Sequence, residues 1–139
     1  MNIKNYFIPV MLLLSFLSVA SARLPGSAEK EKVRSVIREV ESISGKYDSL
    51  DEFGRNTVSQ GKEVLGIGPS AVYTLSNCLN SPDWKVRFWI ADMLGYLDNE
   101  DAKRPLLRLV NDKNENIQVR NQAEKSLKRL GTPIERNIQ

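Results

Sequence analysis

Apolar residues recur at three- and four-residue spacing through most of the chain after residue 27. Between residues 28 and 44 this spacing places Val33, Val36, Ile37 and Val40 on one side of a helix, with charged residues on the other. Gly45 follows the pattern directly, and glycine commonly ends helices. No segment alternates apolar and polar residues for long enough to predict a strand. The pattern therefore predicts an all-α protein that begins with an amphipathic helix.

A second helix is predicted to open after Ser49 and to run to about residue 67. Ser49 followed three residues later by Glu52 is the sequence of a capping box. Gly54 and Gly61 lie inside this helix, and each costs about 1 kcal/mol relative to alanine. We therefore expect the helix to be bent or weak.

Further helices follow, alternately short and long. Breaks rich in glycine, proline, aspartate and asparagine separate segments with helical spacing at 71–79, 84–97, 101–110 and 117–130. Asp83 is a suitable N-cap for the second of these helices. The alternation has a period: Val64, Leu94 and Leu127 occupy equivalent places in successive long helices, at intervals of 30 to 33 residues. A unit of one long and one short helix is therefore repeated and stacked.

The repeated positions carry a recognisable motif. It consists of Asp83, Val86-Arg87, Ala91, Leu94-Gly95, Leu97, Ala102 and Leu106, and it recurs as Val119-Arg120, Ala123, Leu127, Leu130 and Gly131. Over about residues 50–133 this pattern resembles the HEAT-like repeat first associated with phycobilin lyases. The resemblance implies a short right-handed α-solenoid of HEAT-like helix pairs with an N-terminal capping helix. The expected domain covers 28–139, with the cap at 28–45 and repeats at about 49–81, 82–113 and 114–139, the last one truncated.

The long helices at 86–97 (VRFWIADMLGYL) and 119–130 (VRNQAEKSLKRL) differ on one flank. Trp89 in the first corresponds to Gln122 in the second, and Tyr96 corresponds to Arg129. We expect the aromatic flank to meet a neighbouring repeat. The polar flank is then expected to form the outer surface of the last repeat, where the array ends.

The first 22 residues have the plan of a cleavable secretory signal peptide: one positive charge, an apolar run from Tyr6 to Val19, and Ala20-Ser21-Ala22 as a cleavage site. Residues 23–27 read as a linker. We therefore expect an exported protein, periplasmic or secreted, with membrane attachment only if the leader is retained. Cleavage after Ala22 leaves 117 residues with a net charge of +2, because Lys4 is the only charged residue of the leader. That balance does not suggest a nucleic-acid ligand.

The residue content argues against a catalytic, cofactor-binding or metal site. The chain has no histidine and one cysteine, Cys78, which excludes a Ser-His-Asp triad, a zinc site of ordinary type and an intramolecular disulfide. We expect Cys78 to be a small core residue. The resemblance to HEAT-like repeats implies that Arg87 and Arg120 form ion pairs with acidic groups of adjoining turns, although both could also contact a ligand.

Two surfaces are candidates for partner binding. Trp84 and Phe88 lie off the core stripe, so they are either exposed anchors of an aromatic patch or part of the packing between repeats. The outward side of the short helices, which usually lines the concave face of a solenoid, is expected to carry Tyr73, Asn77, Lys103, Arg104 and Arg108. Its three positive charges could bind an acidic peptide or protein surface, or could simply face solvent.

These observations favour a monomeric, exported, non-catalytic module that binds a protein or peptide. The resemblance also implies an alternative, an enzyme or enzyme subunit of the phycobilin lyase kind that acts on a chromoprotein. The two differ in a simple observation, because action on a bilin predicts a coloured complex when protein and pigment are mixed.

Overall fold

Residues 26–132 of the computed structural model fold into a succession of helices, with no strand among these residues. The helices are α1 (Ser27–Ser44), α2 (Leu50–Asn56), α3 (Val58–Ile67), α4 (Ala71–Asn77), α5 (Trp84–Tyr96), the 3₁₀ turn η2 (Glu100–Ala102), α6 (Lys103–Asn111) and α7 (Ile117–Arg129). The predicted helix positions are confirmed within a few residues at each end. The expected signal peptide, most of the linker and residues 133–139 lie outside the described residues.

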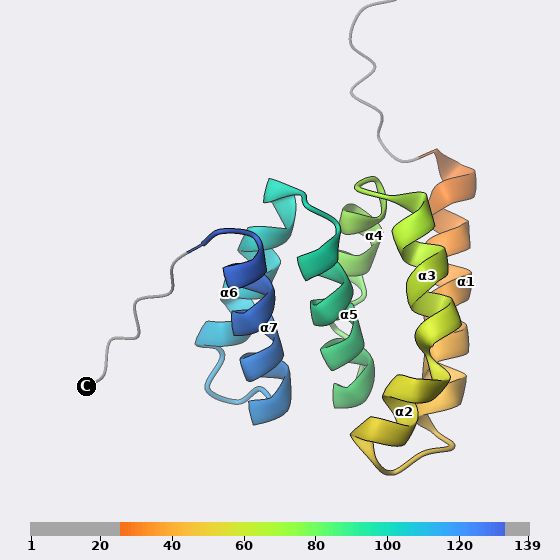
Figure 1. The fold of residues 1–139 in the computed structure, drawn as a ribbon, viewed down its shortest axis with the longest axis horizontal. Coiled ribbons are helices and arrows are strands. Elements are labelled where there is room, and N and C mark those ends of the chain that lie inside the picture. Colours follow the sequence, from red (N-terminus) through yellow and green to blue (C-terminus); the bar gives the residue numbers. More distant parts are fainter. Residues whose placement is uncertain (1–25, 133–139) are drawn as a thin grey trace, which may run out of the picture.

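The helices stand in two rows. Figure 1 shows α3, α5 and α7 side by side in front, with α1, α4 and α6 behind them. Each front helix packs against its neighbour in the row, and α1 packs against α3 and α4 at the N-terminal end. This arrangement is a short helical solenoid, so the predicted fold class is confirmed.

Side-chain caps begin the helices at several of the expected places. The Ser49 hydroxyl accepts a hydrogen bond from the Glu52 amide at 3.1 Å, as the capping box predicts. The carboxylate of Asp83 accepts from the Lys85 amide at 2.9 Å at the start of α5. Asn116 caps α7 in the same way, accepting from the Gln118 amide at 2.8 Å. Each cap satisfies an amide that has no partner within its own helix.

The helix expected to bend between residues 49 and 67 is interrupted at Thr57. The Thr57 hydroxyl donates to the carbonyl oxygen of Phe53 at 3.1 Å and to that of Gly54 at 3.3 Å. This bonding competes with the regular backbone ladder, and α2 turns away from the axis of α3 at its lower end in Figure 1. The expected bend is therefore confirmed, although it lies between the two glycines rather than at either of them.

One continuous apolar core fills the space between the two rows. Its fully buried members include Val33, Val36, Val40, Phe53, Val64, Leu75, Val86, Ile90, Leu94, Leu106, Val119 and Leu127. They come from all seven α-helices of residues 26–132, and the fully buried Ala102 adds a contact from η2, so each helix is fixed by the burial of its apolar side.

The expectation that Gln122 and Arg129 form the outer surface of the last repeat is wrong. Gln122 is only 6% exposed and faces back toward α5, where its amide donates to the Asp92 carboxylate at 2.6 Å. Arg129 pairs with the same carboxylate at 3.3 Å and lies 3.7 Å from the centre of the Tyr96 ring. Trp89 of α5 and Gln122 of α7 therefore each face the preceding helix. Tyr96, expected on the same flank as Trp89, is 51% exposed and lies against Arg129 of the following helix, so the expectation that it is packed between repeats is wrong.

Candidate functional site

A largely apolar groove opens between α2–α3 and α5. Its volume is about 290 Å³. It is lined by Leu50, Phe53, Gly54, Thr57, Val58, Gly61, Lys62, Leu65, Phe88, Trp89, Asp92 and Met93. We call this the α3–α5 groove. Residues of α2, of the break at Thr57 and of α3 line one side of it, and residues of α5 line the other.

Of the two aromatic residues expected as exposed anchors, the structure places one in this groove. Phe88 lines it, whereas Trp84 at the start of α5 does not. Both side chains are half-buried and pack against the core. Trp89, the neighbour of Phe88, is 5% exposed and lines the groove as well. Packing between repeats therefore accounts for a large part of the aromatic surface at 84–89.

Two apolar residues of α3 that were not predicted as site residues also line the groove. Val58 is 53% exposed and Leu65 is 40% exposed, and they lie seven residues apart on one side of the helix. Exposed apolar side chains that gather at a groove are typical of an interaction site. In the sequence, these two residues could have been recognised by their spacing of seven, which places both on one side of α3, away from the buried Val64.

Two charged side chains line the groove on opposite helices. Lys62 of α3 forms no ion pair within residues 26–132. Asp92 of α5 is half-buried, and burial raises the pKa of its carboxyl group, while the neighbouring Arg129 acts in the opposite direction. Because Arg129 offsets the charge of Asp92, the uncompensated charge at the groove is the positive charge of Lys62.

The second candidate surface is formed by the outward side of α4 and α6. Tyr73, Asn77, Arg104 and Arg108 are exposed. Lys103 is half-buried and pairs with Glu100 at 2.6 Å. Tyr73 and Arg104 occupy equivalent repeat positions, as do Asn77 and Arg108. We call the five residues Tyr73, Asn77, Lys103, Arg104 and Arg108 the basic face.

The two arginines of the basic face are available to a ligand. Neither Arg104 nor Arg108 forms an ion pair within the described part of the chain. Leu107, which lies between them, is 39% exposed. On α1, the ammonium group of Lys30 lies 5.7 Å from the centre of the Tyr73 ring and adds a further positive charge beside the basic face.

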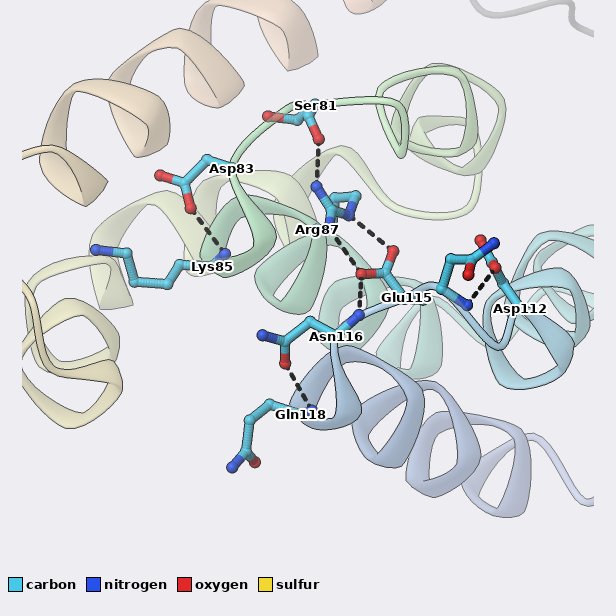
Figure 2. A network of polar contacts seen from close by, with 9 residues as sticks. Ser81, Asp83, Lys85, Arg87, Asp112, Glu115, Asn116 and Gln118 are labelled. Carbon is cyan, nitrogen blue, oxygen red and sulfur yellow. Dashed lines mark hydrogen bonds and ion pairs between the residues drawn. The ribbon is translucent and has the colours of Figure 1, made fainter.

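Arg87 belongs to a structural network. Figure 2 shows its guanidinium between the Ser81 carbonyl and the Glu115 carboxylate. The two bonds to Glu115 measure 2.8 and 2.7 Å, and the bond to Ser81 measures 2.6 Å. The hydrogen bonds that Arg87 donates to Glu115 are the largest cause of its raised pKa. The ion pair expected with an adjoining turn is therefore confirmed for Arg87.

Arg120 differs from Arg87, although it holds the equivalent repeat position. Its Nε is buried without a hydrogen-bond partner, and it forms no ion pair with any residue of 26–132. The expected structural ion pair is therefore not found there.

The remaining chemistry is sparse. Burial raises the pKa of the half-buried Cys78 thiol, which disfavours the reactive thiolate. Among residues 26–132, no three side chains of the kinds that ligate metals lie close enough to hold an ion together. Nor does any helix in that range have the length and apolar character needed to cross a bilayer.

The comparisons with known proteins agree with the architecture. Residues 72–138 match the family model described as HEAT repeats. The match begins in α4 and takes in α5, α6 and α7, so the resemblance to HEAT-like repeats is confirmed over that part of the chain. Neither the curated proteins nor the solved structures gave a match. HEAT repeats generally mediate contacts between proteins.

Proposed function

We propose that this chain is an exported, non-catalytic module that binds an acidic segment of a partner protein on the basic face. One observation carries the proposal: exposed residues of α4 and α6 occupy equivalent repeat positions, and the two arginines among them have no ion pair within residues 26–132. Guanidinium groups bind carboxylates through paired hydrogen bonds, which makes them well suited to an acidic partner.

The surroundings of the basic face support the same partner chemistry. Tyr73 offers an exposed aromatic ring and Asn77 an exposed amide. Leu107, an exposed apolar residue of α6 next to Arg108 in the sequence, offers apolar contact. Partner surfaces combine these features, since aromatic residues and arginine are enriched where binding energy is concentrated. Lys103, already paired with Glu100, contributes less free charge than the arginines do.

The proposal of export rests on the first 22 residues, which follow the plan of a signal peptide. N-terminal sequencing of the protein isolated from cells tests it. A mature start at Arg23 supports export with cleavage, and a start at Met1 contradicts cleavage.

A charge reversal tests the binding site. The variant Lys103/Arg104/Arg108→Glu is compared with Lys46/Arg55/Lys113→Glu, which makes the same change of net charge at exposed positions outside the basic face. We expect the first variant to lose a cross-linked partner in envelope extract and the second to retain it. Equal retention by both variants would contradict the basic face as the site, and equal loss would show a general effect of charge.

Mixing the protein with a bilin tests the non-catalytic part of the proposal. We expect no coloured complex. A stable coloured complex would support an enzyme of the phycobilin lyase kind instead.

A further inference from the structure

The two flanks of α5 differ in how closely they are packed. On the α7 side, Gly95 lies so close to Ser126 that a Cβ added to the glycine would come within 2.6 Å of the serine Cβ. On the α3 side, Met93 packs near Gly61 of α3, but a groove of about 290 Å³ opens beside this contact. The solenoid is therefore closed on one side of its central front helix and open on the other.

We infer that the α3–α5 groove binds one short amphipathic helix of a partner protein, with the apolar side of that helix in the groove and an acidic residue beside Lys62. The inference rests on the proposed binding function, but it concerns a different surface. An amphipathic helix laid into an apolar groove between helices is an established mode of protein recognition.

The length of the apolar surface fits a helix of two to three turns. Val58 and Leu65 are seven residues apart in α3, which corresponds to about 10 Å along the helix axis. A partner helix with apolar residues at positions i, i+3 or i+4 and i+7 presents side chains over the same distance. Phe88 and Met93 supply the opposite wall from α5.

The charges at the groove favour an acidic residue on the partner helix over a basic one. Lys62 lies between Val58 and Leu65 in the α3 sequence and has no ion pair within residues 26–132. The Asp92 carboxylate already accepts bonds from Gln122 and Arg129. A carboxylate on the partner helix therefore finds an unpaired ammonium group, whereas a basic residue finds a carboxylate that is already paired. Complementary charge of this kind fixes the orientation of the helix in the groove.

Binding of a defined peptide to the full chain tests the inference. The probe is a fluorescent helical peptide of about 14 residues, long enough for nearly four turns, with leucines along one side and glutamates beside them. A scrambled peptide of the same composition is the control for non-specific apolar contact. We expect saturable binding of the first peptide in fluorescence anisotropy, and at least about tenfold weaker binding of the scrambled one.

Two matched variants locate the site. Leu65→Asp places a charge in the groove, and Ile117→Asp places one at an exposed apolar residue of α7 outside both the groove and the basic face; the two residues are 40% and 56% exposed. We expect Leu65→Asp to weaken binding about tenfold and Ile117→Asp to leave it within about twofold. Lys62→Glu should weaken binding of the glutamate peptide and strengthen binding of a lysine counterpart. Circular dichroism confirms that each variant is folded.

The outcomes separate this inference from the proposed function. If the basic-face reversal weakens peptide binding and Leu65→Asp does not, the peptide occupies the basic face, and only the groove inference is overturned. Equal binding of the scrambled peptide, or no saturable binding of the helical one, also overturns it. Binding that weakens only with Leu65→Asp and Lys62→Glu supports the groove, even if the charge reversal leaves the cross-linked partner unaffected.

Discussion

Arg87 and Glu115 form a two-bonded ion pair that joins the first turn of α5 to the turn before α7 (Figure 2). The pair is largely buried, with 18% of the Arg87 side chain and 6% of the Glu115 side chain exposed. Glu115 also accepts a hydrogen bond from the Asn116 amide at 2.6 Å, at the residue that caps α7. One carboxylate therefore links two neighbouring repeats and fixes the start of the later one.

Removing one partner of this pair is expected to destabilise the solenoid strongly. Arg87→Met leaves Glu115 as a buried carboxylate without its cation, which costs about 3 kcal/mol in the free energy of unfolding. Arg120→Met is the matched control, because Arg120 has the same repeat position but no ion pair within residues 26–132. It is expected to cost less than about 1 kcal/mol. Urea denaturation followed by circular dichroism measures both, and equal costs would show that the ion pair is not what makes Arg87 important.

The close approach of α5 and α7 depends on Gly95. A Cβ at this position would come within 2.6 Å of the Ser126 side chain and 2.8 Å of the Arg129 guanidinium. Gly95→Ala is therefore expected to cost about 1 to 3 kcal/mol through overpacking, despite the better helix propensity of alanine. The thermal unfolding midpoint measures this loss.

Gly54→Ala is the control for helix propensity alone. Apart from the adjoining backbone of its own helix, no atom lies within 4 Å of an added Cβ at Gly54, so this variant is expected to gain up to about 1 kcal/mol. A second variant, Ser126→Gly in the Gly95→Ala background, should recover part of the loss by making room for the methyl group. A loss that Ser126→Gly does not reduce would place the strain elsewhere.

The cap of α5 also connects this helix to α1. The Asp83 carboxylate accepts from the Lys85 amide through one oxygen and from the hydroxyl of the buried Ser44 through the other, at 2.9 and 2.5 Å. Asp83→Ala is expected to cost about 2 to 3 kcal/mol, because it removes the cap and leaves the buried hydroxyl without an acceptor. Asn116→Ala removes only a cap and is expected to cost about 1 kcal/mol.

A double-mutant cycle with Ser44→Ala isolates the connection between helices. We expect Asp83→Ala and Ser44→Ala to be coupled by about 1 kcal/mol in the free energy of unfolding. Additive losses would mean that the bond from Ser44 to Asp83 adds nothing to stability, and that Asp83 acts only as a cap.

The helices and their inward sides could be predicted from the sequence because both depend on local spacing. Apolar periodicity identified α1 and its buried residues Val33, Val36 and Val40. The turn and cap residues identified the helix starts at Ser49 and Asp83. Each of these features depends on residues within one or two helical turns, so one sequence is enough to recognise it.

The direction in which a helical flank faces could not be predicted in the same way. Trp89 and Gln122 were placed correctly on one flank, but the spacing around one helix does not tell which neighbour that flank contacts. The structure shows that it contacts the preceding helix. The amide of Gln122 therefore meets Asp92 at the α5–α7 interface. Phe88 and Trp89 of α5 instead line the groove that α5 forms with α2 and α3.

The groove could not be predicted from the sequence for a related reason. Its width depends on where α2 leaves the axis of α3 and on how far α3 stands from α5, and both are set by tertiary packing. From the sequence alone, Val58 and Leu65 are therefore two separate apolar residues, and only the structure shows that they line one groove. The outward residues of α4 and α6 were predictable, since exposure there follows directly from helical spacing.

Asp92 gives the stability of the α5–α7 interface a specific dependence on pH. Burial raises the pKa of its carboxyl group above the ordinary value of 3.8, although Arg129 opposes the shift. The folded chain then binds this proton more tightly than the unfolded chain does. Stability from this group is therefore fully present below the ordinary pKa, and it is lost as the pH rises through the raised value.

Comparison with Asp92→Asn over a pH series tests this dependence, because the amide cannot ionise. We expect the free energy of unfolding of the wild-type protein, measured relative to Asp92→Asn, to fall as the pH rises above about 4 and to level off toward neutrality. Arg129→Met removes the cation that favours the ionised carboxyl group, so the fall should become larger in that background. A relative stability that rises with pH instead would mean that Arg129 and Gln122 stabilise the ionised carboxylate more than burial disfavours it.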